Sequence, residues 1–284
     1  MKAAVFDDRA CWLGEGPLWH PRRNELFWFD IHNHQLLSQT GAVWNFPVAV
    51  SAAAWINEQR LMVASEIALH LFDIDTGNHE TICDLEADNP VTRSNDGRAD
   101  PYGGFWIGTM GKDHEPKAGS YWRYYRGELK RLYAGIGVPN AICFTPDGET
   151  AFITDTMTHC KIMRIPLDSN GWPRGEPEVY LDLGSEGLLP DGAVIDAEGN
   201  FWNAQYKAGR VAGYDTDGRL IAVVEVDAPQ ATCPAFGGSD LTTLYCTSAT
   251  QTMTPDALAA SPDSGKTFYL EGVAKGQEEH QVIL

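Results

Sequence analysis

Short runs of apolar residues, separated by turns rich in Asp, Gly, Asn and Pro, recur along the whole chain. Each unit has one apolar strand, a tight turn and a second strand with an aromatic residue near its start. The turn residues favour hairpins, and the β-branched and aromatic residues that follow them favour strands. Clear copies are 17–30, 97–109, 141–155 and 192–204, and weaker copies are 53–64 and 235–247. The pattern predicts an all-β chain built from a repeated unit.

The period of the repeat can be measured at the matching apolar position of each second strand. These marker residues are Trp28, Met62, Trp106, Phe152, Trp202 and Tyr245, with spacings of 34, 44, 46, 50 and 43 residues. A propeller blade of four strands needs roughly 40–45 residues. The spacing therefore predicts a single six-bladed β-propeller domain over residues 1–284, with four antiparallel strands in each blade. A β-sandwich, or a pair of them, is the alternative, but it predicts no regular period.

Features between the units agree with blades. Turn sequences at 73–77, 167–171 and 214–218 are expected to join the third and fourth strands of three blades. The first of these has an Asp-x-Asp pattern that superficially matches a calcium-binding EF-hand, but it lacks the remaining acidic ligands and the flanking helices. Helical spacing is found only in the short segment 255–260.

Composition and charge restrict the partners. The chain is 43% hydrophobic and 21% charged, which is ordinary for a globular protein. Its 39 Asp and Glu against 21 Lys and Arg give a formal net charge of −18, which disfavours nucleic acid and anionic membranes. There is no transmembrane-length apolar run, no signal-peptide pattern and no paired spacing among six cysteines, so free thiols and a cytoplasmic location are expected. A monomer or weak oligomer is expected.

Polar residues recur 11 to 13 positions before the markers. They are Glu15, Asn95, Asn140 and Asp191 in four units, with Ser51 and Pro234 at this position in the weaker units. Because the innermost strands of a propeller run side by side around a channel, we expect these residues to meet at one channel mouth, just before those strands. Taken singly, Asn and Asp beside Gly and Pro are typical of turns, and Asp96 is expected to cap one.

Two carboxylates and two amides gathered on one axis would be costly without a compensating cation. Carboxylate and amide oxygens suit Ca²⁺, Mg²⁺ or Mn²⁺, and Zn²⁺ also accepts them. The shared phase therefore predicts one divalent metal ion, of undetermined identity, at this channel mouth.

Several ordered segments carry a family resemblance. They are Leu-Gly-Glu-Gly-Pro-Leu-Trp (13–19), Arg-Ser-Asn-Asp-Gly-Arg-Ala-Asp-Pro-Tyr-Gly-Gly-Phe-Trp-Ile-Gly-Thr-Met (93–110), Pro-Asn-Ala-Ile-Cys-Phe-Thr-Pro-Asp-Gly (139–148), Pro-Asp-Gly-Ala-Val-Ile-Asp-Ala-Glu-Gly-Asn-Phe-Trp (190–202), Ala-Gly-Arg-Val (208–211) and Phe-Gly-Gly (236–238). With these segments in order, the chain resembles the gluconolactonase and senescence-marker-protein (regucalcin) family of six-bladed propellers.

The resemblance implies roles for particular residues. The family binds one divalent metal through a Glu, an Asn and an Asp, which fall on Glu15, Asn140 and Asp191. It places substrate contacts on Arg93 and Asn95, and it suggests Glu115, four residues before Gly119, as a further contact. It implies metal-dependent hydrolysis of a sugar lactone, with Asp191 also acting as the catalytic base and Glu15 as the second choice for that role.

Other functions stay open at this point. The same site could serve a non-catalytic, calcium-binding regulator, or a metal-dependent esterase or organophosphate hydrolase. The chain has neither Gly-x-Ser-x-Gly nor His-Glu-x-x-His, so serine-esterase and zincin chemistry are disfavoured. The sequence does not identify the sugar, although Arg93 or Arg98 facing the pocket would favour an acidic one. Loops 111–120 and 155–162 are expected to close over the substrate.

Overall fold

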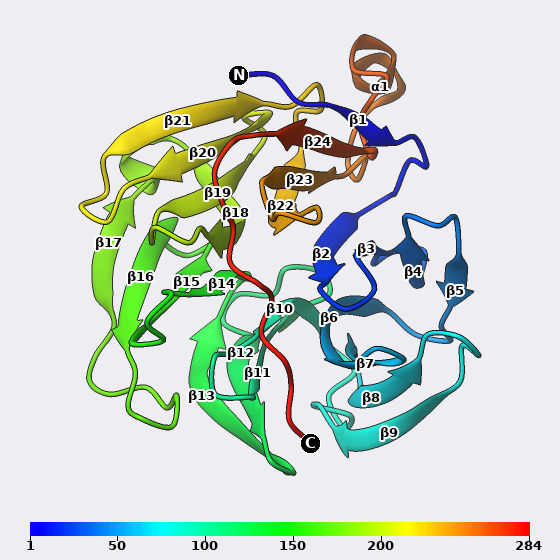
Figure 1. Cartoon of the computed structure of the whole chain (residues 1–284), viewed down its shortest axis with the longest axis vertical. Coiled ribbons are helices and arrows are strands. Elements are labelled where there is room, and N and C mark those ends of the chain that lie inside the picture. Colours follow the sequence, from blue (N-terminus) through cyan, green and yellow to red (C-terminus); the bar gives the residue numbers. More distant parts are fainter.

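The computed structural model describes all 284 residues, and almost all of its regular structure is β-strand. Its strands form six separate sheets of four strands each, arranged as blades around one axis (Figure 1). Neighbouring strands within every sheet pair antiparallel, as in Phe27 of one strand opposite Leu18 of the next. The predicted six-bladed β-propeller with four antiparallel strands per blade is therefore confirmed.

The first five blades each use four consecutive strands, which follow one another from the centre of the ring outwards. Blade 1 contains β2 (Gly14–His20), β3 (Glu25–Asp30), β4 (Gln35–Ser38) and β5 (Val43–Asn45). Blade 2 contains β6 (Val50–Asn57), β7 (Arg60–Ser65), β8 (Ala68–Asp73) and β9 (His79–Asp84). Blade 3 contains β10 (Thr92–Ala99), β11 (Phe105–Gly111), β12 (Gly119–Tyr125) and β13 (Glu128–Ile136). Blade 4 contains β14 (Pro139–Phe144), β15 (Thr150–Asp155), β16 (Lys161–Pro166) and β17 (Glu178–Asp182), and blade 5 contains β18 (Leu189–Ile195), β19 (Phe201–Tyr206), β20 (Arg210–Tyr214) and β21 (Leu220–Glu225).

Blade 6 joins the two ends of the chain. Its inner strands are β22 (Ala231–Gly237), β23 (Thr243–Ser248) and β24 (Thr267–Glu271), and its outer strand is the N-terminal β1 (Ala4–Asp7). β1 pairs antiparallel with β24, Ala4 opposite Tyr269 (Figure 1). This pairing closes the ring with backbone hydrogen bonds between the first and last strands.

The few helices are short. The segment 255–260 is the helix α1 (Pro255–Ala260), as its spacing predicted, with the Thr254 side chain accepting a hydrogen bond from Ala257 N as the N-cap. A short 3₁₀ turn, η1 (Gly184–Glu186), precedes β18. Neither segment has the length or apolar character needed to span a bilayer. All six cysteines are free thiols, and four of them are buried.

Six hydrophobic clusters form the core, one between each pair of neighbouring blades. Trp106, for example, packs between blades 3 and 4 with Ile142 and Phe144, and Trp202 packs between blades 5 and 6 with Phe236. Every marker residue of the repeat belongs to one of these clusters. The period in the sequence therefore records the burial of one face of each blade against the next.

The register between each innermost strand and its neighbour is interrupted near the start of the strand, in all six blades. In blade 1 the interruption lies between Glu15 and Leu18, and in blade 4 between Asn140 and Cys143. Such bulges redirect side chains relative to a regular ladder. All four polar residues flank or occupy a bulge: Glu15, Asn95, Asn140 and Asp191. They therefore lie within the innermost strands, whereas the sequence pattern predicted a position just before these strands.

The C-terminal segment after β24 crosses the ring at the end of the channel opposite to the bulges (Figure 1). It is held by the far ends of the innermost strands: Trp55 Nε1 donates to Glu279 O at 2.7 Å, Gln281 Nε2 donates to Ile56 O at 2.6 Å, and Gln277 Nε2 donates to Ile195 O at 3.1 Å. Access to the channel is therefore restricted at this end, and the polar residues that recur with the repeat lie at the other.

Candidate active site

A cavity of about 260 Å³ lies where the innermost strands begin. Five of the six residues predicted from the sequence line it, and they come from β2, β10, β14 and β18: Glu15, Arg93, Asn95, Asn140 and Asp191. Its walls are completed by apolar residues such as Leu13, Val138 and Leu189. The ring of blades thus gathers, at one channel mouth, side chains that are up to 176 residues apart between Glu15 and Asp191.

The two carboxylates of this group are buried and lack a side-chain partner. Glu15 is 6% exposed and Asp191 is 7% exposed. Glu15 accepts a hydrogen bond from the backbone N–H of Gly16 at 3.1 Å, and neither carboxylate accepts one from another side chain. Each is therefore an acceptor-rich group without a bonded cation, an arrangement that is costly in a buried site.

The electrostatics of the site follow from this burial. Loss of solvation, then repulsion from Asp96, raises the pKa of Glu15 to about 8. Loss of solvation, then repulsion from Glu15 and Asp96, raises the pKa of Asp191 well above its usual range. Burial lowers the pKa of Arg93 to about 10, against the attraction of Glu15, Glu66 and Asp191. The protein alone therefore disfavours the charged form of both carboxylates.

A chain of hydrogen bonds holds the polar side chains in place. Arg93 Nη1 donates to Asn95 Oδ1 at 2.9 Å, and Asn95 Nδ2 donates to Asn140 Oδ1 at 2.8 Å. Asn140 Nδ2 donates to Thr156 Oγ1 at 2.9 Å, and Thr156 Oγ1 donates to Pro190 O at 2.6 Å, next to Asp191. Because the chain crosses from blade 3 through blade 4 to blade 5, it fixes the relative positions of three blades at the cavity.

The backbone around Asn140 is fixed as well. The buried hydroxyl of Tyr121 accepts a hydrogen bond from Asn140 N at 3.1 Å and lies 3.2 Å from Asn140 O. The next residue, Ala141, has φ of 60°, a conformation unusual for a residue with a side chain. Gly16 has a similar φ of 54° directly after Glu15, and a Cβ there would lie 2.3 Å from Ser51 O. Local backbone geometry therefore helps to orient the side chains of both Glu15 and Asn140.

The donor set fits a hard divalent cation. Glu15 and Asp191 offer carboxylate oxygens without side-chain donors, and Asn140 Oδ1 accepts one hydrogen bond and keeps a second lone pair. No group of three or more His, Cys, Asp and Glu is placed to hold a metal, and the predicted set has two such residues plus an amide. A cation would reverse the electrostatic cost that raises both carboxylate pKa values. Oxygen-only ligation is the preference of Ca²⁺ and Mg²⁺.

Some sequence expectations need correction. Glu115 does not line the cavity; its Oε2 accepts a hydrogen bond from Asp113 N at 3.1 Å within its own loop, and the neighbouring His114 lines the cavity in its place. Arg98 points toward the other end of the channel, where it donates to Ile142 O and pairs with Glu279. A bend of the loop and the direction of β10, respectively, account for these differences.

Two further expectations came from local pattern alone. Asp96 is not a turn cap, since its carboxylate accepts a hydrogen bond from Ile142 N of the next blade at 2.8 Å, and burial raises its pKa to about 6. Pro234 lies in the regularly paired part of β22, and the bulged positions of that strand are Thr232 and Cys233. The marker Tyr245 pairs with Ala235, ten residues earlier, whereas Trp106 pairs with Arg98, eight residues earlier, so counting back the same distance from Tyr245 missed the bulge.

Several lining residues were not found from the sequence. They are Met110, His114, Thr156, Met157, Tyr206, Lys207, Gln251 and Thr252. His114 and Met157 come from the two loops expected to lie over the substrate. Gln251 Nε2 donates to Tyr206 Oη at 3.3 Å, and Gln251 Oε1 lies 3.1 Å from His32 Nε2, so blades 5, 6 and 1 meet at this side. Most of these residues lie at or just after the end of the second strand of a blade, and only this shared position could have indicated from the sequence that they line the cavity.

Comparisons with known proteins agree with this geometry. The family model described as the SMP-30/Gluconolactonase/LRE-like region matches residues 13–250. A protein of Rhizobium meliloti assigned as a sugar lactone lactonase is 39% identical over 281 residues, covering 97% of this chain and 95% of the relative. The 6-deoxy-6-sulfogluconolactonase of Pseudomonas putida is 33% identical over 266 residues, covering 90% of each chain.

A solved structure is similar over the whole length. The crystal structure of a calcium-binding protein, regucalcin, from Agrobacterium tumefaciens has 41% sequence identity and a TM-score of 0.97, covering 100% of this chain and 98% of that one. Together, these relatives confirm the predicted family and the predicted enzyme class, a lactonase. The chain belongs to the SMP-30/gluconolactonase-like family.

Proposed function

We propose that this chain hydrolyses a sugar lactone to the corresponding sugar acid, with one divalent cation held by Glu15, Asn140 and Asp191. The observation that carries the proposal is the pair of buried carboxylates, Glu15 and Asp191, that face a cavity of about 260 Å³ without a side-chain donor. A small sugar ring fits a site of this size and polarity. The similarity to lactonases over nearly the full chain supports the same reaction.

The reaction needs a group that removes a proton from water. A water molecule attacks the lactone carbonyl carbon, the bond from that carbon to the ring oxygen breaks, and a hydroxy acid is formed. We assign the proton transfer to Asp191, which accepts the proton of the attacking water and returns it to the departing ring oxygen. When bound, the divalent cation supplies polarisation of the carbonyl and stabilises the charge that develops on its oxygen.

Arg93 and Asn95 are assigned to substrate binding. The guanidinium of Arg93 is buried, and Nη1 is already engaged by Ser94 O and Asn95 Oδ1, at 2.8 and 2.9 Å. Its remaining N–H groups are free of protein partners in the hydrogen-bond network, so they can donate to two oxygens of a sugar. Asn95 is held between Arg93 and Asn140, which gives it a defined orientation toward the ring hydroxyls.

Calcium is the first cation to test. The ligands are all oxygen, and the solved relative from Agrobacterium is described as calcium-binding. Mg²⁺, Mn²⁺ and Zn²⁺ are the alternatives, since each accepts carboxylate oxygen. Aldonolactones are the proposed substrate class, and the six free thiols suit the cytoplasmic location expected for an enzyme of sugar metabolism.

The test is a lactone panel assayed with defined metals. Protein stripped with a chelator is assayed for acid release from pentono-, hexono- and aldarolactones, alone and with each of the four cations. We expect turnover only after a cation is restored, with at least one lactone opened. Tight calcium binding without turnover on any lactone would support a regulatory protein instead, and turnover that survives metal removal would overturn the assigned site.

A further inference from the structure

Lys207 lies at the rim of the central cavity. It occupies the turn 207–209 between β19 and β20, its side chain is exposed, and its φ of 67° places it in the left-handed region. It lines the cavity that contains Glu15 and Asp191, and its ammonium lies 6.0 Å from the centre of the Tyr206 ring, a distance compatible with a cation–π contact. Among the residues lining that cavity, Lys207 and Arg93 are the lysine and the arginine.

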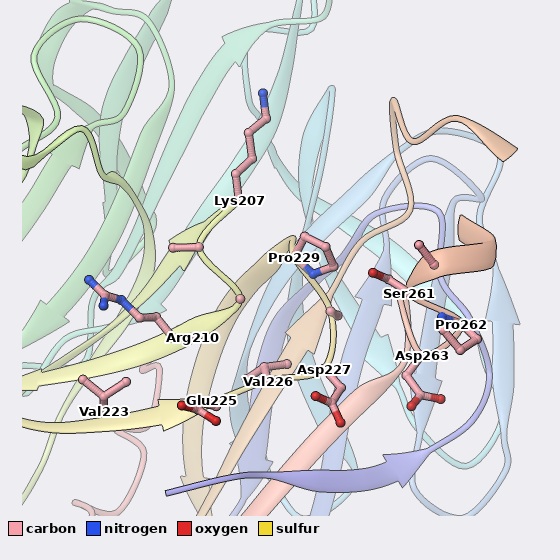
Figure 2. A pocket seen from close by; sticks show the side chains of 14 residues that line it. Lys207, Arg210, Val223, Glu225, Val226, Asp227, Pro229, Ser261, Pro262 and Asp263 are labelled. Atoms are coloured by element: carbon pink, nitrogen blue, oxygen red, sulfur yellow. The ribbon is translucent and has the colours of Figure 1, made fainter. Parts of the chain in front are cut away.

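Lys207 also borders a second hollow, a side groove of about 800 Å³ between blades 5 and 6 (Figure 2). The groove contains several carboxylates, but two of them already have partners. Asp227 pairs with Lys2 at 2.8 Å, and Asp263 pairs with Lys266 at 2.7 Å. Figure 2 shows the Lys207 side chain directed away from Asp227 and Asp263. The charge of Lys207 is therefore not used by the side groove.

No carboxylate of the protein lies within ion-pair distance of Lys207. The fourteen ion pairs of the structure include other exposed lysines, such as Lys112 with Glu66 and Lys161 with Asp182, but not this one. In a protein with a net charge of −18, an unpaired lysine at the mouth of the substrate cavity is a local exception to the overall field.

The charges of the cavity balance in a way that leaves this lysine free for a ligand. Glu15 and Asp191 together match the charge of one divalent cation, and the buried Asp96, which repels both carboxylates, offsets the charge of Arg93. Lys207 is then the uncompensated positive charge at the rim. The acidic surface repels an anion at long range, so an anionic substrate needs such a compensating charge where it enters. A neutral lactone would gain little from it. The rim position also suits a substituent at the end of the sugar remote from the carbonyl that reacts.

We propose that Lys207 binds a negatively charged group at the end of the sugar chain, a carboxylate, sulfonate or phosphate, and so makes the enzyme selective for acidic over neutral lactones. The proposal rests on the proposed lactonase function and adds the chemical class of its substrate. It also replaces the expectation that Arg98 selects an acidic sugar, since Arg98 is paired with Glu279 away from the cavity.

The test compares two lactones that differ by one charge. The γ-lactones of gluconic and glucaric acid share a five-membered ring and differ by a carboxylate at the end of the chain. The wild type is expected to prefer the glucaric lactone. Lys207→Met, which keeps the apolar stem, should lower the ratio of the two kcat/KM values about ten-fold, mainly through KM for the glucaric lactone. Lys207→Arg should retain most of the preference, and added salt should reduce it in the wild type.

Lys275→Met is the matched control, because Lys275 is also exposed and lacks an ion pair, but lies in the segment after β24, where its carbonyl accepts from Ala197 N, and does not line the cavity. It should leave the ratio unchanged. If the wild type opens lactones but Lys207→Met leaves the ratio unchanged, or shifts it no more than Lys275→Met, the proposal for Lys207 is overturned and the lactonase function stands. If no lactone of the earlier panel is opened under any metal, the proposed function itself fails.

Discussion

The two ends of the central channel both contain buried charges, but they treat them differently. At the closed end, Arg98 pairs with Glu279, and its Nε donates to Ile142 O at 3.1 Å. The space left there is about 20 Å³. At the open end, Glu15 and Asp191 face a cavity of about 260 Å³ and receive no side-chain donor. One end satisfies its charges within the chain, and the other leaves them for something that must be bound.

The comparison separates charges that maintain the fold from charges that serve chemistry. Removing one partner of a buried pair such as Arg98 and Glu279 strongly destabilises the protein, because the other charge stays buried. A buried carboxylate without a partner costs stability while it is present, and the raised pKa values of Glu15 and Asp191 measure that cost. The substitutions below should therefore have opposite consequences at the two ends.

The largest effect is expected at the open end. Asp191→Asn or Glu15→Gln should abolish metal retention and lower lactone turnover about a thousand-fold or more, since a ligand or the base is lost. Stability of the stripped protein should be unchanged or higher, because a buried carboxylate has been neutralised. Metal content, kcat and denaturant unfolding would be measured on each variant, with the exposed Glu178→Gln as control. Full activity with full metal retention in Asp191→Asn would refute the site.

The closed end should behave in the reverse manner. Glu279→Ala leaves Arg98 buried without its partner, and we expect a loss of about 3 kcal/mol in the free energy of unfolding. Metal affinity and kcat should change less than two-fold, since neither residue lines the cavity. Glu278→Ala removes a neighbouring carboxylate whose pair with Arg22 is exposed, and it should cost less than about 1 kcal/mol. Equal losses in the two variants would contradict the assignment of a stabilising pair.

The pH dependence of stability should report the cost of the unpaired carboxylates at the open end. The folded-state pKa values of Glu15, about 8, and Asp191 are raised, so their stabilising contribution is complete below the unfolded values and is lost as pH rises toward 8. The stripped protein should therefore fall by about 5 °C in Tm between pH 5 and pH 8. Saturating calcium binds the ionised carboxylates, so the gain in Tm from calcium should grow over the same range. Asp191→Asn should flatten the dependence of Tm on pH. A Tm of the stripped wild type that does not change with pH would contradict the raised pKa values of Glu15 and Asp191.

A smaller effect is expected at Thr156, which connects Asn140 to Pro190. Thr156→Val keeps the shape but removes the hydroxyl, so the Asn140 side chain loses its acceptor. We expect metal affinity to fall about ten-fold, as is usual when a group that orients a ligand is removed. Thr156→Ser restores the hydroxyl and should recover most of the affinity. Calorimetric titration with calcium measures both, and equal affinities for Val and Ser would show that the hydroxyl has no orienting role.

The sequence by itself determined the repeat and five of the residues that meet at the channel mouth, among them both carboxylates. The period appears because each marker, such as Trp106 or Trp202, is buried between two blades, and burial is recorded locally as an apolar residue in a strand. Glu15, Asn140 and Asp191 could be aligned because each occupies the same place in its own blade. A ring then brings equal positions of separate blades to one axis, so position within a repeat predicts proximity in space.

Only the tertiary structure decided which neighbours these residues have. The hydrogen bond from Asn95 to Asn140, the contact of Asp96 with Ile142 and the closure of the ring by β1 all join different blades or distant ends of the chain. The same holds for Lys207 at the rim and Glu115 away from it, because a turn of a few residues can direct a side chain into the cavity or back onto its own backbone. Such choices depend on contacts between blades, and these leave no periodic pattern in the sequence.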